Sequence, residues 1–326
     1  MKAVVVREFG AIVSARIEEV ETPQPGDHEI LVDIEAAPAN FVDTLVIQGT
    51  YQFLPERPFI PGKGPAGTVA ACGAAVRRFK PGDRVLAMAE LGGYAEAVCV
   101  HEDQCYALPD ALSFADAASM SLAYDTAWVS LADRARLAPG DTVLVLGATG
   151  AVGDAALQIA KAKGAKVIAA VSSQSKVRQV IDADAVIDLS MPNLRDGLRD
   201  QVCAATAGKG VDIVIDPLGG DYFDAAIRAL AWRGRLVVVG FAAGRIPTLK
   251  MNYPLLKNIE VSGIQISDYR KRMPELVRTC FEEVFAFYCQ GEISIRPANL
   301  YPLTDYARAL DDIIHRRISG RAVLRP

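Results

Sequence analysis

The sequence of 326 residues has few of the side chains from which metal sites and disulfide frameworks are built. Its three histidines, His28, His101 and His315, lie far apart along the chain. Its six cysteines are scattered and form no Cys-x-x-Cys pair, so reduced thiols are a simpler interpretation than disulfides. Because a structural zinc site needs closely organised ligands, the sequence predicts no metal site.

Long apolar runs and an excess of positive charge are also missing. No stretch approaches the ~20 apolar residues that cross a bilayer, and Arg7 and Glu8 interrupt an apolar start too short for a signal peptide. The net charge of -4 gives no reason to expect nucleic acid or an anionic membrane as a partner. We therefore expect a cytoplasmic globular protein that acts on a small molecule, with about two domains at ~150 residues each.

Two rhythms of secondary structure are visible along the chain. The first third reads as short strands separated by turns, over 2–7, 29–37, 67–71, 84–89 and 93–100. From about Leu122, apolar strands alternate with helix-length segments. The expected strands are 142–147, 166–171, 185–188, 211–215, 235–240 and 259–264, and the expected helices 152–163, 176–181, 193–205 and 221–231. This alternation predicts an α/β fold with a Rossmann doubly wound parallel sheet. Helices over 272–290 and 304–315 and a strand over 322–324 follow.

A glycine-rich turn joins the first of these strands to its helix. The segment runs Gly147-Ala148-Thr149-Gly150-Ala151-Val152-Gly153. Gly150 would let the backbone approach a pyrophosphate, and Gly153 would let the helix pack closely on the strand. The helix N-terminus offers free N–H groups to phosphates. We interpret Ala148, Gly150, Ala151, Val152 and Gly153 as a dinucleotide site; the alternative is a tight turn without a ligand.

The end of the second strand indicates which dinucleotide binds. An NAD site usually has an acidic residue there to bind the ribose 2′-hydroxyl, and this segment has none. It carries Ser172, Ser173 and Lys176 instead, which suit a 2′-phosphate, with Arg178 as a second candidate cation. The sequence thus favours NADPH, although solvated helix charges would look the same.

Beyond this turn, motifs along the whole chain resemble the zinc-independent quinone oxidoreductase (ζ-crystallin-like) group of the medium-chain dehydrogenase/reductase superfamily. They are Asn40-Phe41-Val42-Asp43-Thr44, Gly49-Thr50-Tyr51, Pro61-Gly62, Pro81-Gly82-Asp83-Arg84-Val85, Gly92-Gly93-Tyr94-Ala95, Asp216-Pro217-Leu218-Gly219-Gly220, Val239-Gly240-Phe241 and Ser319-Gly320-Arg321-Ala322-Val323-Leu324.

The resemblance implies a GroES-like β-rich catalytic domain over 1–122 and 265–326 and a Rossmann domain over 123–264. It implies a homodimer formed through the edge strand near 259–264. It also assigns further cofactor-binding residues, which are Asn40, Thr126, Leu218, Gly240, Phe241 and Arg321.

Two departures concern zinc. Zinc-dependent relatives carry cysteine where this chain has Asn40, and histidine where it has Lys63. A protonated lysine is a poor zinc ligand. Without a Lewis acid, hydride addition to an electron-poor quinone or α,β-unsaturated carbonyl is easier than oxidation of a simple alcohol.

The resemblance and the residue types make Asn40, Asp43, Tyr51 and Lys63 the candidate catalytic residues. Tyr51 would donate a proton or hydrogen bond, or it only packs a loop edge. Lys63 would polarise a carbonyl or attract an acidic substrate, or it is a loop lysine that points to solvent. Two other functions stay open: a zinc-type alcohol dehydrogenase, and a protein that holds NADPH with little turnover.

Overall fold

The computed structural model describes residues 1–180 and 182–326, which form two compact units. One unit comprises residues 1–122 and 270–326, and the other comprises residues 123–269. The second boundary was expected after Ile264. Residues 265–269 instead belong to the second unit, where the Tyr269 hydroxyl donates a hydrogen bond to Asp133 at 2.6 Å.

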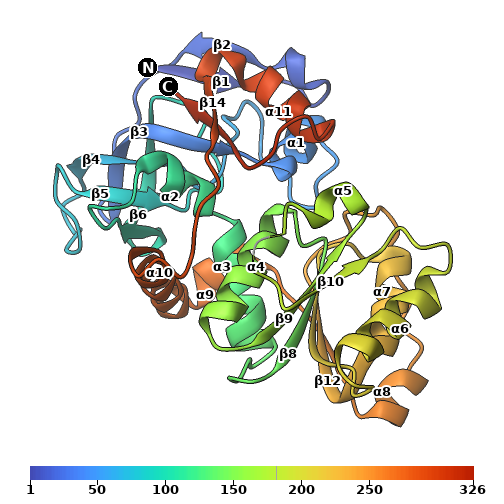
Figure 1. Cartoon of the computed structure of the whole chain (residues 1–326). Helices are drawn as coiled ribbons and strands as arrows, with labels where there is room; N and C mark the ends of the chain where they lie inside the picture. Colours follow the sequence, from blue (N-terminus) through green and yellow to red (C-terminus); the bar gives the residue numbers. More distant parts are fainter. Residues whose placement is uncertain (181) are drawn as a thin grey trace. The chain divides into compact units, whose positions relative to one another are not determined.

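The second unit is built on a parallel sheet of the doubly wound type (Figure 1). Its strand order is β10-β9-β8-β11-β12-β13, so the order reverses between β8 and β11. The strands are β8 (Thr142–Leu146), β9 (Lys166–Val171), β10 (Ala185–Asp188), β11 (Val211–Asp216), β12 (Leu230–Val238) and β13 (Glu260–Gly263). The helices are α3 (Ala123–Val129), α4 (Ala151–Ala162), α5 (Gln174–Val177), α6 (Leu194–Ala205), α7 (Gly220–Ala229), α8 (Asn252–Lys257) and α9 (Ile266–Arg272), which ends in the first unit.

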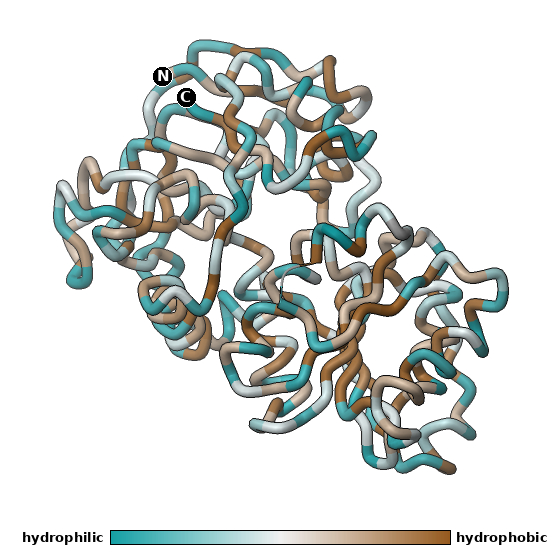
Figure 2. The backbone as a smooth tube through the Cα atoms, in the orientation of Figure 1, coloured by the Kyte–Doolittle hydropathy of each residue, from teal (hydrophilic) through white to brown (hydrophobic). Residues whose placement is uncertain are grey.

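Apolar strands explain why this sheet is covered on both faces. Residues 143–146 and 213–216 have no exposed surface or almost none, and Figure 2 shows the strands as a hydrophobic band within more polar helices. Helix α3 packs with α4, and α6 packs with α7. Buried parallel strands between layers of helix hold the strand ends rigidly, which is where ligands bind in such sheets.

The first unit is β-rich. Its larger sheet has the order β14-β15-β3-β4-β5-β7, and β6 pairs with β3. The strands are β1 (Lys2–Val5), β2 (Arg16–Glu19), β3 (Glu29–Ala39), β4 (Ala66–Cys72), β5 (Arg84–Ala87), β6 (Ala97–His101), β7 (Cys105–Ala107), β14 (Asn299–Pro302) and β15 (Ala322–Arg325). The helices are α1 (Phe41–Gln48), α2 (Phe114–Met120), α10 (Pro274–Cys289) and α11 (Tyr306–Ile314). Because β14 and β15 join a sheet begun by β3, both chain ends build this unit.

Several expected elements differ from those observed. Strand β12 begins at Leu230, five residues before the expected start, because Val211 pairs with Leu230 across an irregularity in the register. The helix expected over 176–181 is the short α5, and Ile181 lies outside the described residues. No helix was expected where α1, α2, α3, α8 and α9 lie. Among the described residues, no helix is both long and apolar enough to cross a bilayer.

Candidate functional site

Helix α1 buries an acidic side chain in the first unit. Asp43 is 1% exposed, and one carboxylate oxygen accepts hydrogen bonds from the Asn40 backbone N–H at 2.9 Å and the Tyr94 hydroxyl at 2.9 Å. Asn40 precedes the helix and Asp43 lies in its first turn, so the contact is also a helix cap. Burial raises the pKa of Asp43 to about 6, against the opposing effects of these hydrogen bonds and of the Lys63 charge. Asn40, Asp43 and Lys63 therefore share one electrostatic environment.

Lys63 belongs to a buried chain of charges. Its ammonium donates to the backbone oxygen of Glu90 at 3.0 Å and to a Glu90 carboxylate oxygen at 2.5 Å. The other carboxylate oxygen of Glu90 accepts a hydrogen bond from Arg270 at 2.9 Å. Lys63 is only 8% exposed and Arg270 1% exposed. The interpretation of Lys63 as a loop lysine that points to solvent is therefore wrong, because Glu90 provides the countercharge that its burial requires.

Tyr51 lies in the same electrostatic environment. Its half-buried side chain packs against the core of the first unit, and its ring lies edge-on to Phe53, 6.5 Å between centroids. Burial and the negative charge of Glu90 raise the pKa of Tyr51, while Arg270 lowers it. The described residues give its hydroxyl no hydrogen bond, so this group is available to a ligand. Tyr51 therefore has the packing role considered for it, and its role as a donor to the substrate stays a prediction.

Three residues of this group were missed from sequence: Glu90, Tyr94 and Arg270. Glu90 lies 27 residues from Lys63 and 180 from Arg270, and these separations left no local pattern to detect. One signal was available, because a lysine in the apolar run Pro61–Ala66 needs an acidic partner if it is buried. Glu90, between Ala89 and Leu91, sits in a comparably apolar segment.

In the second unit, the glycine turn leaves β8 and enters α4. A Cβ atom added to Gly153 would lie 2.3 Å from the Gly147 backbone oxygen, so only glycine fits there. Gly150 precedes α4 and is exposed, and an added Cβ would meet only the Gly147 oxygen, at 3.2 Å. Ala148 is fully buried beneath the turn, whereas Ala151 and Val152 begin the helix. A dinucleotide pyrophosphate needs this arrangement of open backbone at a helix N-terminus.

Ser172, Ser173 and Lys176, which the sequence analysis assigned to the 2′-phosphate, follow the end of β9. The Lys176 ammonium donates to the Ser172 hydroxyl at 3.0 Å, and the Ser173 and Ser175 hydroxyls are 2.9 Å apart. The segment 172–178 contains no acidic residue, and Arg178, two residues after Lys176, is exposed. Hydroxyls beside an ammonium match the chemistry of a phosphate monoester.

Leu218, Gly240 and Phe241 lie on the turns that follow β11 and β12. A Cβ on Gly147 would meet the Leu218 side chain at 3.1 Å, so the turn after β11 packs on the glycine turn. A Cβ on Gly219 would meet the Phe241 ring at 2.8 Å. The structure thus gathers these predicted cofactor residues around the carboxyl ends of β8, β11 and β12.

The two remaining cofactor predictions fall in different units. Thr126 is 7% exposed in α3 of the second unit, and that helix packs against α4. Arg321 belongs to the first unit, directly before β15, where Ala322 pairs with Ala39 of β3. Arg321 and Asn40 therefore lie at the same end of this strand pair.

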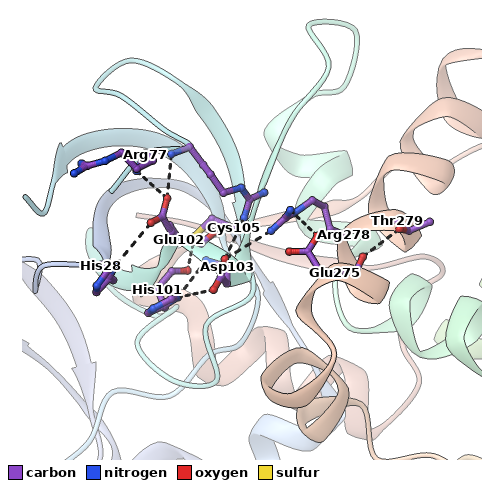
Figure 3. A network of polar contacts seen from close by, with 10 residues as sticks. His28, Arg77, His101, Glu102, Asp103, Cys105, Glu275, Arg278 and Thr279 are labelled. Atoms are coloured by element: carbon purple, nitrogen blue, oxygen red, sulfur yellow. Dashed lines mark hydrogen bonds and ion pairs between the residues drawn. The ribbon is translucent and has the colours of Figure 1, made fainter. Parts of the chain in front are cut away.

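Another polar cluster of the first unit is structural (Figure 3). The Glu102 carboxylate accepts backbone N–H groups of Arg77 and Arg78 at 3.1 and 3.0 Å, and His28 and His101 stack at 5.8 Å. Arg278 of α10 reaches Asp103 at 3.7 Å. The Arg278–Asp103 contact joins α10 to the segment between β6 and β7. Nowhere in the described part of the chain do three or more His, Cys, Asp or Glu side chains gather so that they could hold a metal ion.

Family models match both units. A model described as the alcohol dehydrogenase GroES-like domain matches residues 26–110, and one described as zinc-binding dehydrogenase matches residues 151–282. The quinone oxidoreductase of Mus musculus is 33% identical over 97% of this chain and 94% of its own length. Quinone oxidoreductase-like protein 2 homolog of Nematostella vectensis is 32% identical over 99% of this chain and 88% of its own length.

Solved structures agree with these relatives. A mycobacterial quinone oxidoreductase superposes with a TM-score of 0.92 at 32% identity, covering 100% of both chains. The Escherichia coli quinone oxidoreductase, solved in complex with NADPH, gives a TM-score of 0.89 at 28% identity and also covers 100% of both chains. The resemblance and the fold class drawn from sequence are confirmed. The chain belongs to the quinone oxidoreductase family of the medium-chain dehydrogenase/reductase superfamily.

Proposed function

We propose that this protein is an NADPH-dependent reductase that transfers hydride to a quinone or an α,β-unsaturated carbonyl without a metal. The glycine turn at the end of β8 carries this proposal, together with the Lys176–Ser172 contact after β9, in a segment whose sequence contains no acidic residue. The E. coli relative supports it, because its structure contains NADPH.

The residues present fit the cofactor. Gly150, Ala151, Val152 and Gly153 would bind the pyrophosphate through backbone N–H groups, and Ser172, Ser173 and Lys176 would bind the 2′-phosphate. Leu218, Gly240 and Phe241 would line the rest of the second unit's site, with Thr126, Asn40 and Arg321 as further contacts. When bound, NADPH supplies the hydride.

Lys63 is the group we propose for the substrate oxygen. A lysine ammonium has three N–H donors, and Glu90 accepts two of them. The third has no acceptor in the part of the chain that the structure describes, although the side chain is nine-tenths buried. Such a donor, held in place before the reaction, would stabilise negative charge as it develops on the acceptor oxygen. Tyr51 would donate a further hydrogen bond, and Asp43 would orient Asn40 and the start of α1.

The zinc that one matching family model names does not fit these residues. At the two positions where zinc-dependent relatives carry cysteine and histidine, the chain has the amide of Asn40 and the ammonium of Lys63, which is already paired with Glu90. Zinc in proteins is held by thiolate, imidazole and carboxylate ligands. The proposed reaction therefore relies on Lys63 where a metal-dependent enzyme would use a Lewis acid.

A substrate panel tests the function. Purified protein is given NADPH or NADH with quinones, enals, enones and simple aldehydes, and cofactor oxidation is followed at 340 nm beside metal analysis of the same sample. We expect NADPH oxidation with quinones or enones and no stoichiometric zinc. Reduction of simple aldehydes by protein with bound zinc would contradict the proposal, as would NADPH binding without turnover of any acceptor.

The phosphate site makes a separate prediction. Lys176→Ala should raise the Kd for NADPH about tenfold and leave that for NADH unchanged, because only NADPH carries the 2′-phosphate, and a charge-assisted bond contributes about 1.5 kcal/mol. Isothermal titration calorimetry with both cofactors measures this. Lys166→Ala, at the opposite end of β9, is the matched control, and equal weakening of both cofactors would contradict the assignment.

We also propose that β13 pairs with β13 of a second copy to form a homodimer. It is the last strand of the sheet, and the Ile264 N–H bonds to Val238 of β12. Because N–H groups alternate in direction along a strand, those of Val261 and Gly263 face away from β12. An open edge of this kind is a template for pairing with another chain.

Pairing through β13 predicts how substitutions in this strand change the oligomeric state. Light scattering should give a dimer for the wild type and a monomer for Val261→Pro, which removes an outward donor. Val261→Thr keeps that donor and should remain dimeric. A monomeric wild type, or a dimeric proline variant, would contradict pairing through β13.

A further inference from the structure

A buried carboxyl ends β11 at the point where the sheet's strand order reverses. Asp216 is the last residue of that strand, which lies between β8 and β12. In doubly wound sheets the cofactor crosses the carboxyl ends of the strands at this reversal. Asp216 has no exposed surface, and none of the roles proposed above uses it.

The two oxygens of this carboxyl have different surroundings. Oδ1 accepts backbone N–H groups of Leu218 at 2.9 Å and Gly219 at 2.8 Å, which closes the turn after β11. Oδ2 is buried and has no hydrogen-bond partner among the described residues. Buried polar atoms without a partner are rare in proteins, so this oxygen calls for a reason.

Three cofactor turns meet around Asp216. Its own turn carries Leu218, which packs on Gly147 of the glycine turn. Its backbone oxygen accepts the Val239 N–H at 2.8 Å, which places the turn that continues into Gly240 and Phe241. The carboxyl therefore lies directly beneath the surface that these turns form.

No ion pair neutralises the charge of Asp216 in the described part of the chain. Segments packed on its turn carry Asp221 and Asp224 of α7 and Arg245 after β12, and Arg245 forms ion pairs with both aspartates at the surface. Burial raises the pKa of Asp216 to about 6, against the two backbone N–H groups. At neutral pH the carboxyl is mostly ionised, and its charge acts through a medium that screens it weakly.

The proposed cofactor site fixes which part of the dinucleotide faces this charge. The 2′-phosphate belongs to the adenosine half, which we place at β9, and the pyrophosphate belongs at the start of α4. The nicotinamide half must then extend the other way, over β11 and β12. Hydride transfer to the acceptor changes the nicotinamide ring from neutral to cationic, with two electrons and one proton leaving together.

We propose that Asp216 is an electrostatic determinant of the cofactor's redox state, whose carboxylate favours the oxidised, cationic nicotinamide over the reduced, neutral one. This inference rests on the proposed binding of NADPH. An unpaired carboxylate has a function here, because a countercharge would cancel the field that acts on the ring. The same field would lower the barrier to hydride transfer, since positive charge already develops in the transition state.

The ratio of two dissociation constants tests this proposal without turnover. Calorimetry on the full chain gives the Kd for NADP⁺ and the Kd for NADPH. We expect Asp216→Asn to raise the ratio Kd(NADP⁺)/Kd(NADPH) on the order of tenfold, because the variant removes one weakly screened charge. Asparagine keeps an oxygen for the Leu218 and Gly219 N–H groups. Asp212→Asn, on the same strand at its other end, is the matched control and should leave the ratio unchanged.

The wild type offers a second measurement if the variant fails to fold. This ratio of dissociation constants should rise as the pH falls from 8 to 5, with a midpoint near the Asp216 pKa of about 6. The phosphates are the same in both cofactor forms, so their titration cancels. A ratio unmoved both by Asp216→Asn and by pH would overturn the inference while leaving NADPH binding intact. Failure of the wild type to bind either form would overturn the proposed function as well.

Discussion

Replacing Lys63 with methionine should lower kcat/KM for NADPH-dependent reduction by about 10²- to 10³-fold, the loss usual for removal of one oxyanion donor. Methionine approximates the length and volume of the lysine stem but has no N–H to offer the substrate oxygen. The Kd for NADPH should stay the same, because Lys63 belongs to the first unit and the phosphate-binding turns to the second. Steady-state kinetics on the best quinone or enone, with calorimetry for the cofactor, measures both quantities.

The Lys63→Met protein should still fold. Glu90 keeps its hydrogen bond to Arg270, so no buried carboxylate is left unpaired. Lys80→Met provides the matched control, because Lys80 is exposed on a turn of the same unit. If Lys63→Met kept wild-type kcat/KM for every accepted substrate, Lys63 would be a structural lysine only and the role proposed for it would be wrong.

The cofactor turn and the charge chain differ in how far sequence could predict them. The glycine turn is encoded within seven consecutive residues, because Gly153 is required by its close approach to the Gly147 oxygen and Gly147 has a positive φ of 62°. The alternation of apolar strands and helices predicted the doubly wound sheet for a similar reason. Interactions between near neighbours leave a pattern in the sequence.

Long-range pairing leaves no such pattern. The environment of Lys63 depends on Glu90 and on Arg270, which reaches the site from α9, a helix that sequence did not indicate. Without those partners, a solvated lysine was the simpler interpretation, and the structure corrected it. The predicted start of β12 was too late for a similar reason. Its first residue, Leu230, pairs with Val211, which lies 19 positions earlier in the chain and across an irregular register.

Removal of the shared carboxylate should have the largest effect on stability. Glu90→Gln leaves the buried Lys63 and Arg270 without the acid that both contact. Deleting one partner of a buried ion pair costs about 3–5 kcal/mol of unfolding free energy. Because Glu90 is partly exposed, we expect a loss of about 3 kcal/mol. The midpoint temperature of thermal unfolding, Tm, should fall by about 6–12 °C, since each kcal/mol of lost stability lowers Tm by roughly 2–4 °C. Glu96→Gln, an exposed acid of the same unit, should change little.

Replacing the entire charge chain separates its structural role from its chemical role. The triple variant Lys63→Met, Glu90→Leu, Arg270→Met removes all three charges together, so most of the stability lost in Glu90→Gln should return. Reductase activity should not return, because the donor to the substrate oxygen is still missing. Scanning calorimetry and steady-state kinetics on the wild type, Lys63→Met, Glu90→Gln and the triple variant test both statements. If the triple variant regained both stability and activity, the three charges would serve only to stabilise the fold. If it regained stability without activity, Lys63 would have the proposed role as a donor to the substrate.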